Sequence, residues 1–451
     1  MTTTSDQGAF VWRPTGLLES YFVTRSNLDY YQCVCVWSQF NRPVPKLHLY
    51  GAIHALIARN PALCTIVLES KTRSMKFALA KDVDLDKIVE YRTTTGSFEE
   101  FLTELHEVRF TYEAMTPVWK LFVWNEKTVA FVFDHATLDG TSGALFHVQL
   151  AQLLNDRSIL LPADVSPIVK VDQSMKLNPA VESIVSTSPS LRFAASTLFQ
   201  EFGPKWGPFR PLAERDGTIF APYVHPVEGS IWRILEIPAA RVNLLLNKCR
   251  AQNTTLTALF HTLLVIGMSK AYPSVRGFDT SVPINARRFM TSYVDAANEM
   301  GAYVFQYKEI TSALKEFSWD EVIRFGSALK KGTTKRSGYI LGMLKYLFGN
   351  ISGWMEAKLG NVRETDIELS NVGAWKFTGG IDDEMSYRVL QLGFSQPHGT
   401  LNPAIKLNCA GVVGGSTTLT LCFSDKIAGE GKGDMVFGVI KHMVEKLSET
   451  D

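Results

Sequence analysis

The sequence has 451 residues, a length that predicts two domains of roughly 200 residues each, because single hydrophobic cores stop growing near this size. Its hydrophobic fraction of 46% and charged fraction of 20% are typical of a folded globular protein and exclude a mainly disordered chain. Because 46 basic residues balance 45 acidic ones, nothing marks a general nucleic-acid binder, and no nucleic-acid partner is expected.

The first part of the chain mixes strand-like and helix-like segments. Strands are predicted where β-forming residues concentrate, at 30–40, 118–124 and 128–134. Helices are predicted where apolar residues recur at helical spacing, at 46–63 and from Gly140 to about Asn155. The Asn60-Pro61 step should end the first of these helices, and the polar residues 125–127 should join the last two strands as a hairpin.

The middle of the chain has a different character. Nine prolines fall between about 160 and 226, where the periodic pattern fades. We therefore predict an N-terminal domain at 1–160, a crossing segment at 161–226 and a C-terminal domain at 227–451. In the last of these, strands are predicted at 229–237, 388–394 and 416–423, and helices at 240–252, 254–272 and 435–447. This irregular alternation predicts a two-domain α/β fold with mixed sheets and flanking helices.

The cysteines and the apolar segments indicate the cellular compartment that is expected for the protein. The six cysteines contain no CxxC pair, which favours reduced thiols in the cytoplasm over a disulfide framework or a zinc site. The amino terminus, MTTTSDQGAF, has no basic or apolar region of a signal peptide. The best apolar run, 259–268, is far shorter than the ~20 residues that a membrane helix needs. A soluble cytoplasmic protein is expected, with peripheral membrane attachment left open.

One stretch, residues 129–143 (VAFVFDHATLDGTSG), carries the candidate chemistry. An apolar strand ends just before His135, and a neutral imidazole is well suited to remove a proton near neutral pH. Asp139 lies four residues on, where it could fold back and fix the loop through an arginine. Gly140 would allow a turn that a β-carbon obstructs. A polar loop without catalytic function fits the same residues.

Three other sites are weaker. A serine-hydrolase elbow is incomplete around Ser142, because alanine stands where the second glycine should be, and Ser142 is expected to contribute little. No ligand spacing joins His135, Asp139 and His147, so no metal is predicted. The glycines of 429–434 (GEGKGD) lack the spacing of a phosphate-binding loop.

Several segments in order resemble one family. They are 16–40 (GLLESYFVTRSNLDYYQCVCVWSQF), 54–67 (HALIARNPALCTIV), the HATLDG stretch, 280–289 (TSVPINARRF), 368–375 (ELSNVGAW) and 392–399 (LGFSQPHG). Together they resemble the chloramphenicol-acetyltransferase-like, coenzyme-A-dependent acyltransferases that share an HxxxDG motif, and most closely the fungal alcohol O-acetyltransferases. The resemblance spans roughly residues 15 to 445 and is weakest at 160–226.

Two departures narrow the resemblance. Carrier-dependent condensation domains usually have a second histidine where this chain has Asp134. The Asp-Phe-Gly-Trp-Gly motif of plant acyltransferases is missing from the sequence. Both favour the stand-alone fungal branch, which includes ester-forming enzymes of secondary metabolism that act on larger alcohols.

The resemblance implies a geometry for the site. Two similar domains would enclose a tunnel with His135 at its middle, coenzyme A entering at one mouth and the alcohol at the other. Exclusion of water from such a tunnel favours transfer over hydrolysis. Asp139 would pair with Arg287, which matches the arginine that holds this aspartate in the family.

Further candidates are weaker. Ser370 and Asn371 would line the tunnel near the thioester oxygen, although an ordinary turn between strands fits them as well. Lys330, Lys331, Lys335 and Arg336 would meet the phosphates of coenzyme A, although a solvated loop fits them too. Residues 339–360 form an amphipathic, aromatic segment that suits a core or tunnel wall, with a membrane-facing helix as the alternative.

These patterns together predict an acyl-CoA-dependent O-acyltransferase that transfers acetyl from acetyl-CoA to an alcohol, with His135 as general base. No metal or resident cofactor is expected, and acyl-CoA serves as co-substrate. The alternatives are an N-acyltransferase acting on a small amine and a non-catalytic relative that binds a hydrophobic ligand. The protein is expected to be a cytoplasmic monomer, with peripheral contact to the endoplasmic reticulum or lipid droplets left open.

Overall fold

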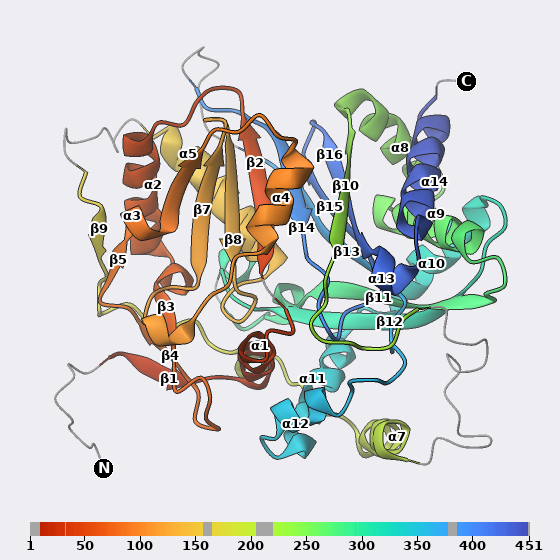
Figure 1. The fold of residues 1–451 in the computed structure, drawn as a ribbon, viewed down its shortest axis with the longest axis horizontal. Coiled ribbons are helices and arrows are strands. Elements are labelled where there is room, and N and C mark those ends of the chain that lie inside the picture. Colours follow the sequence, from red (N-terminus) through yellow and green to blue (C-terminus); the bar gives the residue numbers. More distant parts are fainter. Residues whose placement is uncertain are drawn as a thin grey trace.

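The computed structural model describes residues 10–31, 33–156, 165–203, 220–293, 295–377 and 386–449. In these ranges the chain forms an α/β protein in which two large sheets lie side by side with helices around them (Figure 1). The sheets have five and six strands, and two small sheets of three and two strands lie beside the first. Of the helices in these ranges, none is long and apolar enough to cross a bilayer.

The five-stranded sheet has the order β14-β2-β8-β7-β6. Its strands are β2 (Val34–Phe40), β6 (Val89–Arg92), β7 (Trp119–Trp124), β8 (Thr128–Phe133) and β14 (Val389–Ser395). Helices α2 (Lys46–Arg59) and α5 (Gly140–Leu154) pack on one face, and α4 (Phe98–His106) packs on the other. Because both faces of the sheet are covered, β8 is buried along its whole length, and its sequence is apolar without alternation.

The six-stranded sheet has the order β10-β16-β15-β13-β11-β12. Its strands are β10 (Ser230–Ile237), β11 (Gly277–Asn285), β12 (Val304–Ser312), β13 (Ile367–Trp375), β15 (Ile405–Val412) and β16 (Thr417–Ser424). It is mixed, because β13 runs parallel to both β11 and β15 while the other pairs are antiparallel. A second core forms where this sheet meets α8 (Ala239–Ala251), α9 (Leu256–Ala271), α10 (Trp319–Gly332) and α14 (Lys432–Leu447).

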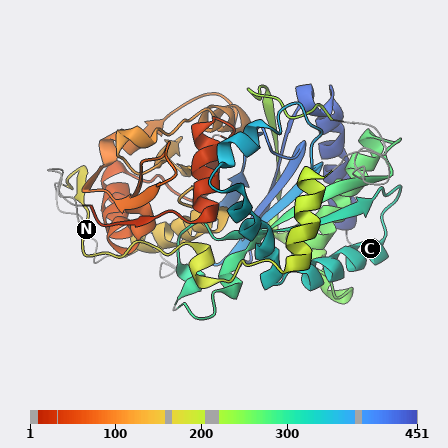
Figure 2. The ribbon, with the colours of Figure 1, turned by 90° about the horizontal axis from the view of Figure 1, so that it is seen from below.

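A third group of elements lies below the junction of the two large sheets. It consists of α1 (Leu17–Asn27), α7 (Leu191–Phe202), α11 (Tyr339–Met343) and α12 (Ile351–Glu356), and Figure 2 looks onto it from below. The remaining elements are β1 (Trp12–Pro14), β3 (Thr65–Leu68), β4 (Lys76–Leu79), β5 (Asp82–Asp84), β9 (Ile168–Lys170), α3 (Leu85–Ile88), α6 (Val181–Ile184) and α13 (Asp425–Ala428).

The N-terminal and C-terminal halves of the chain both contribute strands to the five-stranded sheet. Strand β14 belongs to the second half by sequence, yet it pairs antiparallel with β2, with Gly393 opposite Trp37. Trp232 of β10 stacks on His106 of α4, with ring centroids 4.9 Å apart and planes at 5°. The halves are therefore joined by a shared sheet as well as by aromatic packing. The predicted domain boundaries at residues 160 and 226 stay a prediction.

Most of the predicted elements are present, with ends shifted by a few residues. The segments 118–124 and 128–134 form the hairpin β7–β8, and α5 begins at Gly140 as expected. The crossing segment is more regular than predicted, because β9, α6 and α7 lie within it. Its residues 157–164 and 204–219 lie outside the described residues.

The amphipathic segment 339–360 is not one helix. Helix α11 runs into a 3-10 turn, Leu344–Leu347, before α12 begins. Between them Phe348 and Gly349 adopt φ angles of 49° and 79°. These left-handed conformations end the helix, and they are unfavourable for a phenylalanine.

The β14–β2 contact generates a prediction about stability. A β-carbon built on Gly393 would lie 2.0 Å from Cζ2 of Trp37, so Gly393→Ala should overpack the sheet and lower the free energy of unfolding by about 1–3 kcal/mol. Gly438 is the matched control, because it lies inside α14 with no atom within 4 Å of an added β-carbon. Gly438→Ala should raise the free energy of unfolding by about 0.5–1 kcal/mol. Urea titration measures both, and a Gly393→Ala protein as stable as wild type would contradict this packing.

Candidate active site

His135 lies just beyond the end of β8, where the chain leaves the sheet. Its imidazole stacks on Phe22 of α1, with ring centroids 4.2 Å apart and planes at 18°, and Tyr31 lies 6.2 Å away. The buried Nδ1 makes no hydrogen bond of ordinary geometry with a described residue. Aromatic packing from the first helix therefore fixes the orientation of the ring.

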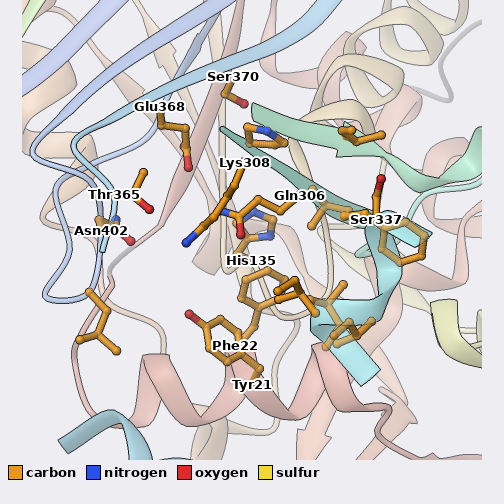
Figure 3. Close-up of a pocket in the computed structure, with 18 of the residues that line it drawn as sticks. Tyr21, Phe22, His135, Gln306, Lys308, Ser337, Thr365, Glu368, Ser370 and Asn402 are labelled. Atoms are coloured by element: carbon orange, nitrogen blue, oxygen red, sulfur yellow. The ribbon is translucent and has the colours of Figure 1, made fainter. Parts of the chain in front are cut away.

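The imidazole lines a cavity of about 430 Å³ to which both halves of the chain contribute. Figure 3 shows Phe22 and Tyr21 on one side of His135, with Glu368 and Ser370 on the opposite side. The helices supply mainly apolar side chains to the wall: Leu18, Phe22, Leu341, Leu344, Leu347 and Trp354. The strands supply apolar side chains such as Phe305 and Phe394, together with a set of polar ones that we call the polar wall: Gln306, Lys308, Glu368, Ser370, Asn371 and Lys406. Helices α1 and α7 also bring Arg25 and Glu201 to the cavity, so its helical side is mainly, but not wholly, apolar.

The surroundings of His135 set its protonation state. Burial lowers the pKa of the imidazole to about 4, and the positive charge of Arg25 acts in the same direction, against the smaller pull of the Asp139 carboxylate. A pKa below the usual value of about 6.5 keeps the ring neutral at neutral pH. The neutral ring is the form that can accept a proton from a bound molecule.

Asp139 is the N-cap of α5 and is fully occupied by hydrogen bonds. Its Oδ1 accepts from the backbone N–H of Ser142 at 2.8 Å, and its Oδ2 accepts from the backbone N–H of Tyr303 at 3.0 Å. Arg287 donates to both oxygens, at 2.7 Å to Oδ2 and 3.1 Å to Oδ1. Burial opposes ionisation, but the nearby guanidinium outweighs it and holds the pKa of Asp139 below its usual value.

Arg287 reaches Asp139 from the second half of the chain. It follows β11 in the short 3-10 helix Ala286–Phe289, and its side chain is 2% exposed. Its Nε donates to the carbonyl of Glu299 at 2.8 Å and its Nη2 to that of Gly301 at 3.2 Å. The pair that the family resemblance implied is therefore a buried link between the two halves.

Ser142 takes part in the hydrogen-bond network around Asp139 and Arg287, which the sequence did not predict. Its hydroxyl oxygen lies 2.8 Å from Oδ1 of Asp139, and it accepts from Arg287 and from the backbone N–H of Gly301, both at 2.9 Å. The hydroxyl is enclosed in this network and does not line the cavity. Ser142 therefore completes the buried Asp139–Arg287 link, and the expectation that it contributes little to turnover stays a prediction.

Gly140 is needed for a reason other than the expected turn. It is the first residue of α5, and its φ is not in the left-handed region. A β-carbon there would lie 2.7 Å from Cγ1 of Val372 and 3.1 Å from the ring of Phe394. Close packing against β13 and β14, rather than a special backbone conformation, excludes a larger residue.

Ser370 and Asn371 line the same cavity as His135. Both belong to β13, at the point where its register with β15 shifts. The amide of Asn371 donates to the hydroxyl of Thr257 at 2.9 Å, and its oxygen accepts from the backbone N–H of Gly373 at 2.8 Å. Asn371 thus shapes the strand, whereas Ser370 lies across the cavity from His135 (Figure 3).

The four cationic candidates lie elsewhere. Lys330 and Lys331 are in the last turn of α10, and Lys335 and Arg336 are in the 3-10 helix that follows it. All four are exposed, and none of them lines the cavity. Their neighbour Ser337 does line it, so the run lies close to an edge of the cavity.

Sequence reasoning missed the charged residues of the cavity wall. Lys406 of β15 is buried, donates to the carbonyl of Pro397 at 3.1 Å and lies 5.2 Å from the ring centre of Tyr31. Burial lowers the pKa of its ammonium to about 8. Lys308 of β12 points into the cavity as well (Figure 3). A lysine within the apolar strand sequence IKLNCAGV was the available signal.

The described residues do not form a metal site from His135, Asp139 and His147. Nδ1 of His147 lies 2.8 Å from the hydroxyl of Ser38, and its Nε2 lies 2.9 Å from the carbonyl of Val36. Asp139 is engaged by Arg287, as described above. In the part of the chain that the structure covers, no group of three or more histidine, cysteine or acidic side chains is placed to hold a metal ion.

Comparison with known proteins adds independent findings. A family model described as alcohol acetyltransferase matches residues 14–434. A probable alcohol acetyltransferase of Fusarium pseudograminearum is 21% identical over 89% of this chain and 86% of its own. An N-acetyltransferase of Saccharomyces cerevisiae is 21% identical over 85% of this chain and 89% of its own. Trichothecene 15-O-acetyltransferase of Fusarium sporotrichioides has a similar structure, with a TM-score of 0.70 and 13% identity over 99% of this chain and 96% of that one.

The structural similarity confirms the expected α/β acyltransferase fold with two halves. The family match covers most of the sequence, including the HATLDG stretch and the strands that surround the cavity. This chain is therefore an acyltransferase and belongs to the alcohol acetyltransferase family.

Proposed function

We propose that the protein transfers acetyl from acetyl-CoA to the hydroxyl group of an alcohol, with His135 as general base. The observation that carries this proposal is a neutral imidazole in a cavity shared by both halves of the chain. The choice of an alcohol is supported by the family description and by the alcohol acetyltransferase from Fusarium pseudograminearum.

The reaction would proceed in two steps at one imidazole. Because Nδ1 is buried, Nε2 of His135 would accept the proton of the alcohol while its oxygen attacks the thioester carbonyl. The tetrahedral intermediate then collapses as the carbon–sulfur bond breaks, and the imidazolium returns the proton to the sulfur of coenzyme A. The products are an ester and a free thiol, and no resident cofactor enters the scheme.

The polar wall would stabilise charge during the reaction. The Ser370 hydroxyl is our candidate donor to the tetrahedral oxyanion, an interaction worth about 3 kcal/mol when well aimed. The ammonium groups of Lys308 and Lys406 add positive potential in the same cavity. Our candidates for binding the phosphates of coenzyme A remain the exposed cations near Ser337, which lies at an edge of the cavity. They are Lys330, Lys331, Lys335 and Arg336.

A second candidate is transfer to a small amine. The yeast relative described as an N-acetyltransferase favours it, and a neutral imidazole can serve an amine as well as an alcohol. Incubation with acetyl-CoA and a panel of alcohols and amines, with detection of thiol and of product mass, separates the two. Thiol release without a mass gain on any acceptor would contradict both.

The base has a direct test. His135→Ala should lower turnover by about two to four orders of magnitude and leave coenzyme A affinity nearly unchanged, because the imidazole acts on the proton and not on the nucleotide. Thiol release measures turnover, and calorimetry measures affinity. A variant that keeps wild-type turnover would remove His135 from the chemistry.

The pH profile is a second test. Activity needs the neutral imidazole, so kcat/KM should fall only as the pH drops through the lowered pKa of His135, well below 6.5 and toward about 4. Burial also lowers the pKa of His106, His147 and His261, so the unfolded state binds protons first and stability falls as the pH drops below about 6.5. Circular dichroism at each pH therefore has to accompany the kinetics. If kcat/KM of the folded protein already falls at pH 6.5 or above, the lowered pKa of His135 is contradicted.

Asp139 should hold the loop without taking part in proton transfer. Asp139→Ala and Arg287→Ala should each lower the free energy of unfolding by about 3–5 kcal/mol, because each leaves a buried charge without its partner. The double variant should have a free energy of unfolding little lower than that of either single variant. His135→Ala is the control, because it should lose activity at an unchanged melting temperature. If Asp139→Ala melts like wild type yet is equally inactive, Asp139 belongs to the chemistry.

A further inference from the structure

Elements on the lower side of the molecule in Figure 1 carry several large apolar side chains that are exposed to solvent. Leu191, at the start of α7, is 87% exposed, and Phe348, between α11 and α12, is 81% exposed. Four more exposed apolar residues belong to the same elements or follow them directly: Phe199, Ile340, Tyr346 and Leu359. We call these six residues the lower apolar surface. Isolated exposed apolar residues are ordinary, but a group on adjacent elements calls for a partner.

The elements that carry this surface pack together. Phe193 of α7 contacts Tyr339 of α11, with ring centroids 5.5 Å apart. Glu201 of α7 accepts from Nε1 of Trp354 at 2.7 Å and from Nζ of Lys358 at 2.8 Å, which ties α7 to α12. Figures 1 and 2 show these helices on one side of the molecule. The apolar residues are therefore presented by one assembled layer.

The conformation of Phe348 is itself costly. Its φ of 49° lies in the left-handed region, and Gly349 follows with a φ of 79°. A non-glycine residue in this region costs of order 1 kcal/mol, and here the turn leaves an aromatic ring in water. Neither feature improves the stability of the isolated protein.

Positive charge accompanies the apolar residues. Lys345 and Arg192 are exposed on the same elements, and Arg73 lies against Gly349, 3.4 Å from the position of an added β-carbon. Among the residues that the structure covers, these three cations have no ion pair. Lys335 and Arg336 add two more exposed cations just before α11. Apolar side chains with unpaired cations around them match the surface of a bilayer that contains anionic lipid.

We propose that the lower apolar surface, with Lys345, Arg192 and Arg73, docks the protein on an anionic lipid bilayer. Ile340 and Tyr346 are exposed and also line the cavity, so docking would place a rim of the cavity against the lipid. An apolar acceptor dissolved in the bilayer could then enter without crossing water. The docking itself does not depend on the proposed transfer reaction.

Vesicle flotation with the full chain tests the docking. Wild type should float with vesicles of phosphatidylcholine and phosphatidylserine, and less with phosphatidylcholine alone. Phe348→Ser should weaken binding by about tenfold, because the variant has no aromatic ring to transfer from water into the bilayer. Lys345→Glu should weaken it by about fivefold on the anionic vesicles, and high salt should reduce this difference.

The controls separate docking from folding and from activity. Val413→Ser removes an apolar side chain that is 56% exposed, at the opposite end of β15 from the cavity residue Lys406, and should bind vesicles like wild type. Phe348 and Lys345 do not line the cavity, so their variants should keep the wild-type melting temperature and the wild-type activity on a water-soluble acceptor.

Three outcomes would overturn the proposal. The first is equal flotation of wild type and Phe348→Ser, and the second is no flotation of wild type. The third is a wild-type dimer in light scattering that Phe348→Ser converts to monomer, which would assign the surface to a second copy of the chain.

Discussion

The buried pair of Asp139 and Arg287 is the interaction on which the site depends. Asp139 caps α5 directly after the His135 loop, and Arg287 follows β11 in the second half of the chain. Their bidentate contact, completed by Ser142 and the backbone of Tyr303, holds the loop from both halves at once. A pair of this kind contributes little net stability over an apolar one, but it fixes geometry, because either partner alone is a buried charge.

The fixed loop places His135 where burial decides its chemistry. Phe22 covers one face of the ring, and Arg25 from the same helix adds a positive charge nearby. Both effects favour the neutral imidazole, which is available as a base at neutral pH. A lowered pKa also makes the ring a weaker base, so a rigid approach of the acceptor and stabilisation of the oxyanion would have to supply much of the rate.

The cavity and the surface below it share elements. Helices α7, α11 and α12 contribute apolar side chains to the cavity, while Leu191 of α7 and Phe348, between α11 and α12, are exposed to solvent. The strands β12, β13 and β15 give it a polar wall with Lys308, Glu368 and Lys406.

The sequence by itself determined the local framework of the site. An apolar strand followed by His135, and a helix that begins at Gly140, can be read from periodicity and from capping residues, because these depend on neighbours along the chain. The pairing of Asp139 with Arg287 came from family resemblance, since the two residues lie 148 positions apart. The tertiary structure alone decided that β14 enters the first sheet, that Lys406 lies in the cavity and that Val372 excludes a β-carbon at Gly140. These features arise from contacts between distant segments, and among them only Lys406 left a local signal, as a lysine within an apolar strand.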